Sequence, residues 1–150
     1  HFRLTRDIAP KIGKQKPALI HNIMIPGLSG PGGKMSASDE NGTVYTTDTP
    51  NVVKKKINKY AFSGGQTSVE EHRKLGGNPD IDVSYQYLRI FFEQDDNKLK
   101  SIYEDYKSGK LLSGELKIIL IDKINDFLTI HQEKREKAKD QIDKFLFENK

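Results

Sequence analysis

The chain has 150 residues, of which 35% are hydrophobic and 31% are charged, and its formal net charge is +4. It contains no cysteine, which excludes disulfides, thiolate catalysis and cysteine-ligated structural zinc. No apolar run approaches the roughly 20 residues of a membrane span, and the basic segment after His1 does not resemble a signal peptide. We therefore expect a soluble, cytoplasmic protein with no membrane contact.

Positive charge is concentrated at the front of the chain. Residues 1–59 contain ten lysines and arginines against four acidic residues, a net charge of +6, so the remaining residues carry −2. Such an excess of cations is typical of proteins that bind phosphate, either in a nucleotide or in a nucleic-acid backbone. The charge pattern alone does not choose between them.

The first predicted element is a strand. Residues 8–33 are rich in proline and glycine, and they contain one coherent apolar stretch at residues 18–25. A short apolar run between such residues is typical of a strand that is covered on both faces in a parallel sheet. The chain supplies no partner strand or crossover helix, so the strand either pairs with sequence outside the chain or does not form.

Helical patterns begin at Thr49, which is expected to cap a helix with Pro50 at its first position. The apolar face of this helix consists of Val53, Ile57 and Tyr60. A second, short helix is predicted from the spacing of Ser68 and Glu71, which matches a capping box. It is expected to end at Gly76 and Gly77.

Two further helices are predicted from caps and apolar spacing. Asp82 is expected to cap the first, and Asp95 or Asp96 the second, which stops at Ser108 and Gly109. The side chains expected to be buried are Val83, Tyr87, Leu88, Ile90 and Phe91 in the first helix and Leu99, Ile102, Tyr103 and Tyr106 in the second.

The last predicted helix is the longest. Ser113 is expected to cap it, and neither proline nor glycine interrupts residues 115–150, a length of about 50 Å in helical form. Its apolar stripe lapses between Ile130 and Ala138, which predicts a break, a bend or an overhang beyond the core. The stripe consists of Leu116, Leu120, Ile124, Phe127 and Leu128, and it resumes at Ala138, Ile142, Phe145 and Leu146.

The segment most suggestive of chemistry is the glycine-rich stretch at residues 27–39. Its glycines allow the backbone to approach an anion, its N–H groups form a concave donor set, and Lys34 adds a point charge. Ser36 and Ser38 add two hydroxyls. The segment is not a Walker loop, because Met35 follows the lysine where serine or threonine is required. On composition alone, a plain linker is the alternative interpretation.

Residues 34–38 read Lys-Met-Ser-Ala-Ser, which resembles the Lys-Met-Ser-Lys-Ser loop of class I aminoacyl-tRNA synthetases, with Ala37 in place of the second lysine. Other segments occur in the same order as in the tryptophanyl-tRNA synthetase family of eukaryotic and archaeal type, and the resemblance covers nearly the whole chain. These segments are residues 2–7, 16–19, 61–65, 70–73 and 76–84.

The resemblance implies a fold and a reaction. Residues 1–47 would be the end of a Rossmann-like α/β catalytic domain and residues 48–150 an α-helical anticodon-binding domain, so that this chain is mainly α. The family activates tryptophan with ATP to tryptophanyl-adenylate and transfers it to tRNA(Trp). The resemblance also implies a homodimer for the full-length enzyme. Mg²⁺ would arrive with ATP, because no cluster in the sequence has metal-ligand spacing.

The resemblance also assigns roles to residues of the loop. Lys34 is expected at the β- and γ-phosphates, the hydroxyls of Ser36 and Ser38 at phosphate oxygens, and the backbone of Met35 at the adenine edge, with Ala37 completing the ATP-binding loop. Two arginines near the start of the chain are further candidates for the nucleotide side, or else are surface charges beside a helix start. They are Arg3 and Arg6.

Candidate tRNA contacts are less specific. Polar side chains at turns and helix starts can reach splayed bases, which favours Gln66, Thr67, Arg73 and Lys117. The lysines at residues 54–56 are as compatible with solvent as with tRNA.

The chain departs from the family in lacking a His-x-Gly-His motif, since His21, His72 and His131 stand alone. We therefore expect the C-terminal portion of a longer enzyme, which by itself binds ATP weakly and forms no adenylate. Two alternatives remain open: a noncatalytic tRNA-binding or scaffold protein, and a tyrosyl-tRNA synthetase.

Overall fold

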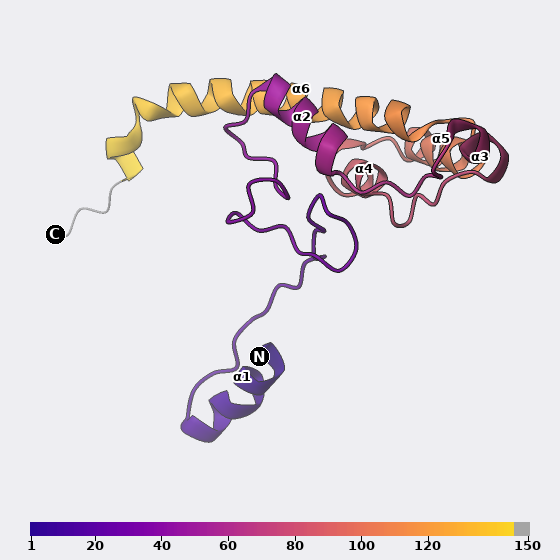
Figure 1. Ribbon diagram of the computed structural model, residues 1–150. Helices are drawn as coiled ribbons and strands as arrows, with labels where there is room; N and C mark the ends of the chain where they lie inside the picture. The colour runs from indigo at the N-terminus through magenta and orange to yellow at the C-terminus, as the bar shows by residue number, and fades with distance from the viewer. Residues whose placement is uncertain (146–150) are drawn as a thin grey trace.

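The computed structural model describes residues 1–145. Its regular elements are the α-helices α1 (Phe2–Ile8), α2 (Pro50–Tyr60), α3 (Val69–Leu75), α4 (Val83–Tyr87), α5 (Asp96–Lys107) and α6 (Ser113–Lys139), the 3₁₀ helices η1 (Ala9–Ile12) and η3 (Ile142–Phe145), and the π-helix η2 (Leu88–Phe92). Figure 1 shows α6 as the long axis, with α2 along its middle and α3, α4 and α5 toward one end. The prediction of a mainly helical chain is confirmed.

The predicted buried strand is wrong. Residues 18–25 form neither helix nor strand, and Ile20, Ile23 and Met24 are 88%, 76% and 74% exposed. A strand must pair the N–H and C=O groups along its edges, and no other part of residues 1–145 forms a strand beside it. The nearest feature is an isolated antiparallel bridge between Pro26 and Lys34.

The helix α2 forms as its sequence predicts. Thr49 takes the extended cap conformation and Pro50 opens the helix, although the Thr49 side chain makes no capping hydrogen bond. Val53 and Ile57 are completely buried, so they anchor α2 in the shared core. Lys56 is also buried, at 9% exposure, and the apolar pattern did not predict this.

The caps of the next helices are confirmed. The hydroxyl of Ser68 accepts a hydrogen bond from the Glu71 amide at 3.1 Å, and α3 ends at Gly76. Asp82 caps α4 and Asp95 caps α5 through side-chain oxygens that accept backbone N–H groups. Local side-chain chemistry therefore sets these boundaries.

At the end of α3, only glycine fits at position 76. Its φ of +73° is in the left-handed region, and a Cβ there would lie 1.8 Å from the Lys107 carbonyl oxygen. The close approach brings the α3 terminus against the end of α5. The glycine therefore serves packing between two helices as well as chain termination.

Two phenylalanines expected in the core are instead exposed, Phe91 by 45% and Phe127 by 51%. The turn that contains Phe91 widens into a π-helix, in which the Glu93 amide donates to the Leu88 carbonyl five residues earlier. This widening shifts the side chains away from the 3.6-residue spacing on which the prediction rested.

The start of α6 also differs from the prediction. The helix begins at Ser113, so the cap position belongs to Leu112, whose amide donates to the Glu115 carboxylate at 2.7 Å. The Ser113 hydroxyl lies 3.0 Å from the Tyr106 hydroxyl. Ser113 therefore contributes to a tertiary hydrogen bond rather than to capping.

The end of α6 explains the lapse in its apolar stripe. The backbone stays helical to Lys139, while residues 133–139 are all exposed, so this part is an overhang. The helix then ends at Asp140 rather than continuing to Lys150, and Ile142 is 55% exposed. Leu146, predicted to resume the stripe, lies outside the described residues.

Glu93, at the end of η2, forms ion pairs with lysines on α5 and α6. Its side chain is 5% exposed, and its Oε2 lies 3.2 Å from the ammonium groups of Lys98 on α5 and Lys123 on α6. Burial raises the pKa of Glu93, but the Asp95 amide and the two ammonium groups outweigh it and bring the pKa to about 2.

This shift predicts a pH-dependent contribution to stability. The folded pKa lies below the ordinary value of 4.5, so the contribution of Glu93 is fully present above about pH 4.5 and is lost as the pH falls toward 2. Replacing Glu93 by glutamine should therefore lower the free energy of unfolding at pH 7 and have progressively less effect below pH 4.5. Urea unfolding followed by circular dichroism at several pH values measures this.

The matched control is Glu136→Gln, because Glu136 also pairs with a lysine but its side chain is 60% exposed. Exposed pairs contribute little to stability, so this variant should unfold like the wild type at every pH. A Glu93→Gln deficit of the same size at pH 7 and at pH 2.5 would contradict the role assigned to Glu93.

Candidate functional site

The loop at residues 34–38 is anchored at its base by backbone hydrogen bonds. The Met35 amide donates to the Ile25 carbonyl at 3.1 Å, and the Gly27 amide donates to the Gly33 carbonyl at 3.0 Å. Together with the Pro26–Lys34 bridge, these bonds fix where the loop begins. The Lys34 side chain is exposed to solvent.

Two carbonyl groups inside the loop are bonded to side-chain donors. The Ser36 carbonyl accepts from the Thr43 hydroxyl at 2.7 Å, and the Ala37 carbonyl accepts from the Tyr45 hydroxyl at 2.8 Å. The two serine side chains lie together, with 2.9 Å between the Oγ atoms of Ser36 and Ser38. The structure therefore brings the two serine hydroxyls of the loop together.

Asp39, the acidic residue after the loop, is hydrogen-bonded within a turn. One oxygen of Asp39 accepts the Gly42 amide at 2.9 Å and the Asn41 amide at 3.2 Å. Within residues 1–145 there is no group of three or more histidine or acidic side chains that could hold a metal ion.

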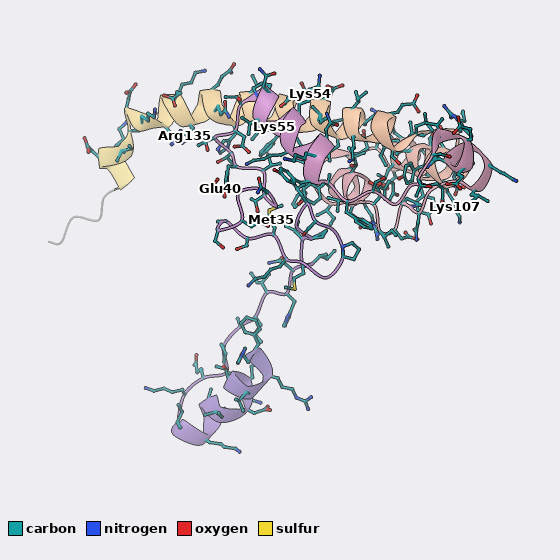
Figure 2. All side chains as sticks on the ribbon, in the orientation of Figure 1. Met35, Glu40, Lys54, Lys55, Lys107 and Arg135 are labelled. Carbon is teal, nitrogen blue, oxygen red and sulfur yellow. The ribbon has the colours of Figure 1, made fainter. Side chains whose placement is uncertain are left out.

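The Met35 side chain faces an apolar cavity of about 280 Å³ between the loop and the helices. Figure 2 shows Met35 between the loop and the helical layer. Contact with the helices gives the loop a second anchor beside its backbone hydrogen bonds. The other residues lining the cavity are Val44, Thr46, Tyr87, Phe91, Phe92, Ile124, Phe127 and Leu128.

The sequence prediction did not include Thr43, Tyr45 or Lys56, which support the loop. Lys56 follows Val53 by three residues and precedes Ile57 by one, which puts it on the buried face of α2. That spacing is the signal that could have separated Lys56 from its neighbours. Figure 2 shows Lys54 and Lys55 projecting from α2, and both are exposed.

Arg3 and Arg6 are not brought to the loop. Both lie on α1, which Figure 1 shows apart from the helical layer and connected to the loop by an extended segment. The Arg6 guanidinium donates to the Pro17 carbonyl, and Arg3 is exposed. Their role at the nucleotide stays a prediction.

The predicted tRNA contacts divide into two sets. Gln66 and Thr67 are exposed and line an open cavity of about 410 Å³ between the α2–α3 turn and the start of α6. Their side chains also bond within the turn region: the Gln66 amide donates to the Gly76 carbonyl at 2.9 Å, and the Thr67 hydroxyl donates to Glu71 at 2.6 Å.

Arg73 and Lys117 bond elsewhere. The Arg73 guanidinium donates to the carbonyls of Gly109 and Lys110 beyond the end of α5. The Lys117 ammonium donates to the Asn58 carbonyl on α2 at 3.3 Å, and burial lowers its pKa against a smaller opposing effect of Asp82. Each of the four side chains thus has a hydrogen-bond partner within the protein, and their contact with tRNA stays a prediction.

No helix in the described part of the chain combines the length and apolar character needed to cross a bilayer.

Comparison with known proteins relates the chain to a family. A family model described as class I tRNA synthetases (W and Y) matches residues 1–129. The tryptophan–tRNA ligase of Sulfurisphaera tokodaii is 57% identical over 148 residues, which are 99% of this chain and 39% of that protein. The cytoplasmic tryptophan–tRNA ligase of Saccharomyces cerevisiae is 51% identical over 151 residues, covering 100% of this chain and 35% of that protein.

Solved structures share the fold. The tryptophanyl-tRNA synthetase of Giardia lamblia aligns with a TM-score of 0.79 and 49% identity, over 91% of this chain and 33% of that chain. The chain thus spans less than half of the length of the curated relatives it matches.

Proposed function

This chain belongs to the class I tRNA synthetases for tryptophan and tyrosine, and from that premise we propose that it is part of a tryptophan–tRNA ligase. The complete enzyme would activate tryptophan with ATP and transfer the aminoacyl group to tRNA(Trp). The relatives above 50% identity are tryptophan–tRNA ligases, which favours tryptophan over tyrosine as the substrate.

The observation that carries this proposal is the geometry of the 34–38 loop. Lys34 is exposed and is followed within four residues by two serines whose hydroxyl oxygens lie 2.9 Å apart. The Ser36 and Ala37 carbonyls accept hydrogen bonds from protein donors. The segment offers an ammonium group and hydroxyl groups to an anion, and two of its carbonyl groups are already hydrogen-bonded within the protein. A polyphosphate is the ligand that matches it best.

The lysine and serine groups of the loop would act in the activation of tryptophan by ATP. When the tryptophan carboxylate attacks the α-phosphorus of ATP, negative charge grows on the leaving pyrophosphate. An ammonium group that meets this charge as it develops stabilises the transition state more than the bound substrate. We assign Lys34 to the β- and γ-phosphates, Ser36 and Ser38 to phosphate oxygens, and the Met35 backbone to adenine, with Mg²⁺ entering as part of the substrate MgATP.

The helical part would serve the tRNA. In this proposal residues 1–47 complete the catalytic domain and residues 48–150 bind the anticodon region, with Gln66 and Thr67 as the first contacts to test because both are exposed at one cavity. The complete enzyme would act as a cytoplasmic homodimer. The yeast relative is named as cytoplasmic, which supports that location.

Pyrophosphate exchange tests the proposal. The complete enzyme that carries this chain should exchange labelled pyrophosphate into ATP when tryptophan is present, and should do so far less with tyrosine. The 150-residue chain alone should show no exchange. Tyrosine-dependent exchange would establish the tyrosyl alternative, and tRNA binding without exchange would establish the noncatalytic one.

A further inference from the structure

A buried lysine lies beneath the 34–38 loop, at the face of α2 that packs in the core. Lys56 is 9% exposed. Its Nζ donates to the Thr43 carbonyl at 2.9 Å and to Asp48 Oδ2 at 2.7 Å, and it lies 4.3 Å from the centroid of the Tyr45 ring. The three partners belong to the short segment between the loop and α2.

Two of these partners hold the loop directly. The Thr43 hydroxyl donates to the Ser36 carbonyl at 2.7 Å, and the Tyr45 hydroxyl donates to the Ala37 carbonyl at 2.8 Å. Lys56 is therefore connected to two consecutive residues of the loop through one intermediate residue each. These two bonds hold the part of the loop that carries Ser36 and Ser38, which follows directly on Lys34 and Met35.

The third partner fixes the segment at its other end. Asp48 Oδ2 also accepts the Tyr45 amide at 2.9 Å, and the Asp48 side chain is only 11% exposed. The carboxylate thus joins Lys56 to the backbone that carries the Tyr45 ring. Both charges are paired and hydrogen-bonded, as buried charges must be.

Stability alone does not account for a lysine at this position. The neighbouring core positions of α2 are Val53 and Ile57, both completely buried. A buried ion pair usually contributes no more stability than well-packed apolar side chains of similar volume. What Lys56 supplies, and an apolar residue cannot, is a set of directed bonds to the segment that holds the loop.

We propose that Lys56, with Tyr45 and Thr43, is a positioning group that holds the ATP-binding loop against α2 in the geometry needed for adenylate formation. This inference rests on the proposed function of the loop. Because α2 packs along α6 (Figure 1), the contacts of Lys56 fix the position of the loop relative to the helical layer. Lys56 itself does not touch the reacting atoms.

The cleanest test is Tyr45→Phe in the complete enzyme. The substitution keeps the ring beneath the Lys56 ammonium and removes only the hydroxyl that bonds Ala37. Loss of one such bond should lower kcat for tryptophan-dependent pyrophosphate exchange by about three- to tenfold. The KM for tryptophan should not change, and the thermal midpoint should fall by at most a few degrees, because the lost bond is a single exposed one. Lys56→Met should lower kcat further, and Lys55→Met, on the exposed side of the same helix, should have no effect.

A double-mutant cycle separates positioning from a general structural effect. If Tyr45 acts only by placing the loop that carries Lys34, then adding Tyr45→Phe to Lys34→Ala should lower kcat by less than twofold. An equal loss in both backgrounds, or a Tyr45→Phe enzyme with unchanged kcat, would overturn the proposal. The wild-type enzyme is assayed first: absence of exchange there refutes the proposed function itself, whereas normal exchange with inert variants refutes only this inference.

Discussion

Replacing Lys34 by alanine in the complete enzyme is expected to lower kcat for tryptophan-dependent pyrophosphate exchange by about 10²–10³-fold, the range found when one preorganised charge donor is removed from a transition state. The Lys34 ammonium is exposed at a loop whose base and carbonyls are fixed by protein hydrogen bonds. It can therefore meet the pyrophosphate charge without reorganising the core. The KM for tryptophan should stay close to that of the wild type, since the loop is assigned to ATP and not to tryptophan.

Lys55→Ala is the matched control for Lys34→Ala, because both lysines are exposed and Lys55 lies on the adjoining helix α2. It removes the same net charge and should leave exchange unchanged. Equal losses in the two variants would mean that the overall positive charge of the region, and not the position of Lys34, promotes the reaction.

The largest loss of stability is expected from Asp82→Ala. Asp82 is 1% exposed, and its oxygens accept the Gly64 amide and the Tyr106 hydroxyl at 2.8 Å each and the Ser84 amide at 2.8 Å. The substitution removes the cap of α4 and leaves buried donors without an acceptor. We expect a loss of about 3–5 kcal/mol in the free energy of unfolding, measured by urea unfolding of the chain.

Asp80→Ala provides the comparison, because Asp80 is exposed and, within residues 1–145, its side chain accepts a single 3.3 Å hydrogen bond, from the Tyr103 hydroxyl. It should lower the free energy of unfolding by less than about 1 kcal/mol. The Tyr106 phenol gives a second readout: burial and the Asp82 charge raise its pKa to about 12, and Asp82→Ala should bring that pKa down. A stable Asp82→Ala chain with an unchanged Tyr106 would contradict the network.

The helices of this chain were largely predictable from sequence because their boundaries are set by nearby residues. Ser68, Asp82 and Asp95 each bond amides two or three positions along, and such interactions can be read from spacing. The five residues of the loop are consecutive, so their resemblance to a family motif was visible in the sequence. The roles assigned to them stay predictions.

Features that depend on distant parts of the chain were not predictable. The strand at residues 18–25 needs partners that residues 1–145 do not provide. The π-helix at η2 moved Phe91 out of the core, and an apolar pattern carries no sign of such a widening. Ser113 bonds to Tyr106, a tertiary contact that competes with the capping role its position suggested.

The support of the candidate site was the part that sequence reasoning missed. Lys56 stands within a run of lysines, and its burial depends on the register of α2 against the core. Its partners Thr43, Tyr45 and Asp48 are polar residues of an irregular segment without a recognised motif. Only their geometry relates them to the loop.

Transfer from preformed tryptophanyl-adenylate tests the central claim most directly, which is that Lys34 acts on the leaving pyrophosphate. The pyrophosphate is absent in the second half of the reaction, so its stabilisation no longer matters. A Lys34→Ala enzyme supplied with synthetic tryptophanyl-adenylate should aminoacylate tRNA(Trp) within about twofold of the wild-type single-turnover rate, while remaining defective in exchange. A transfer rate reduced as much as the exchange rate would contradict the account.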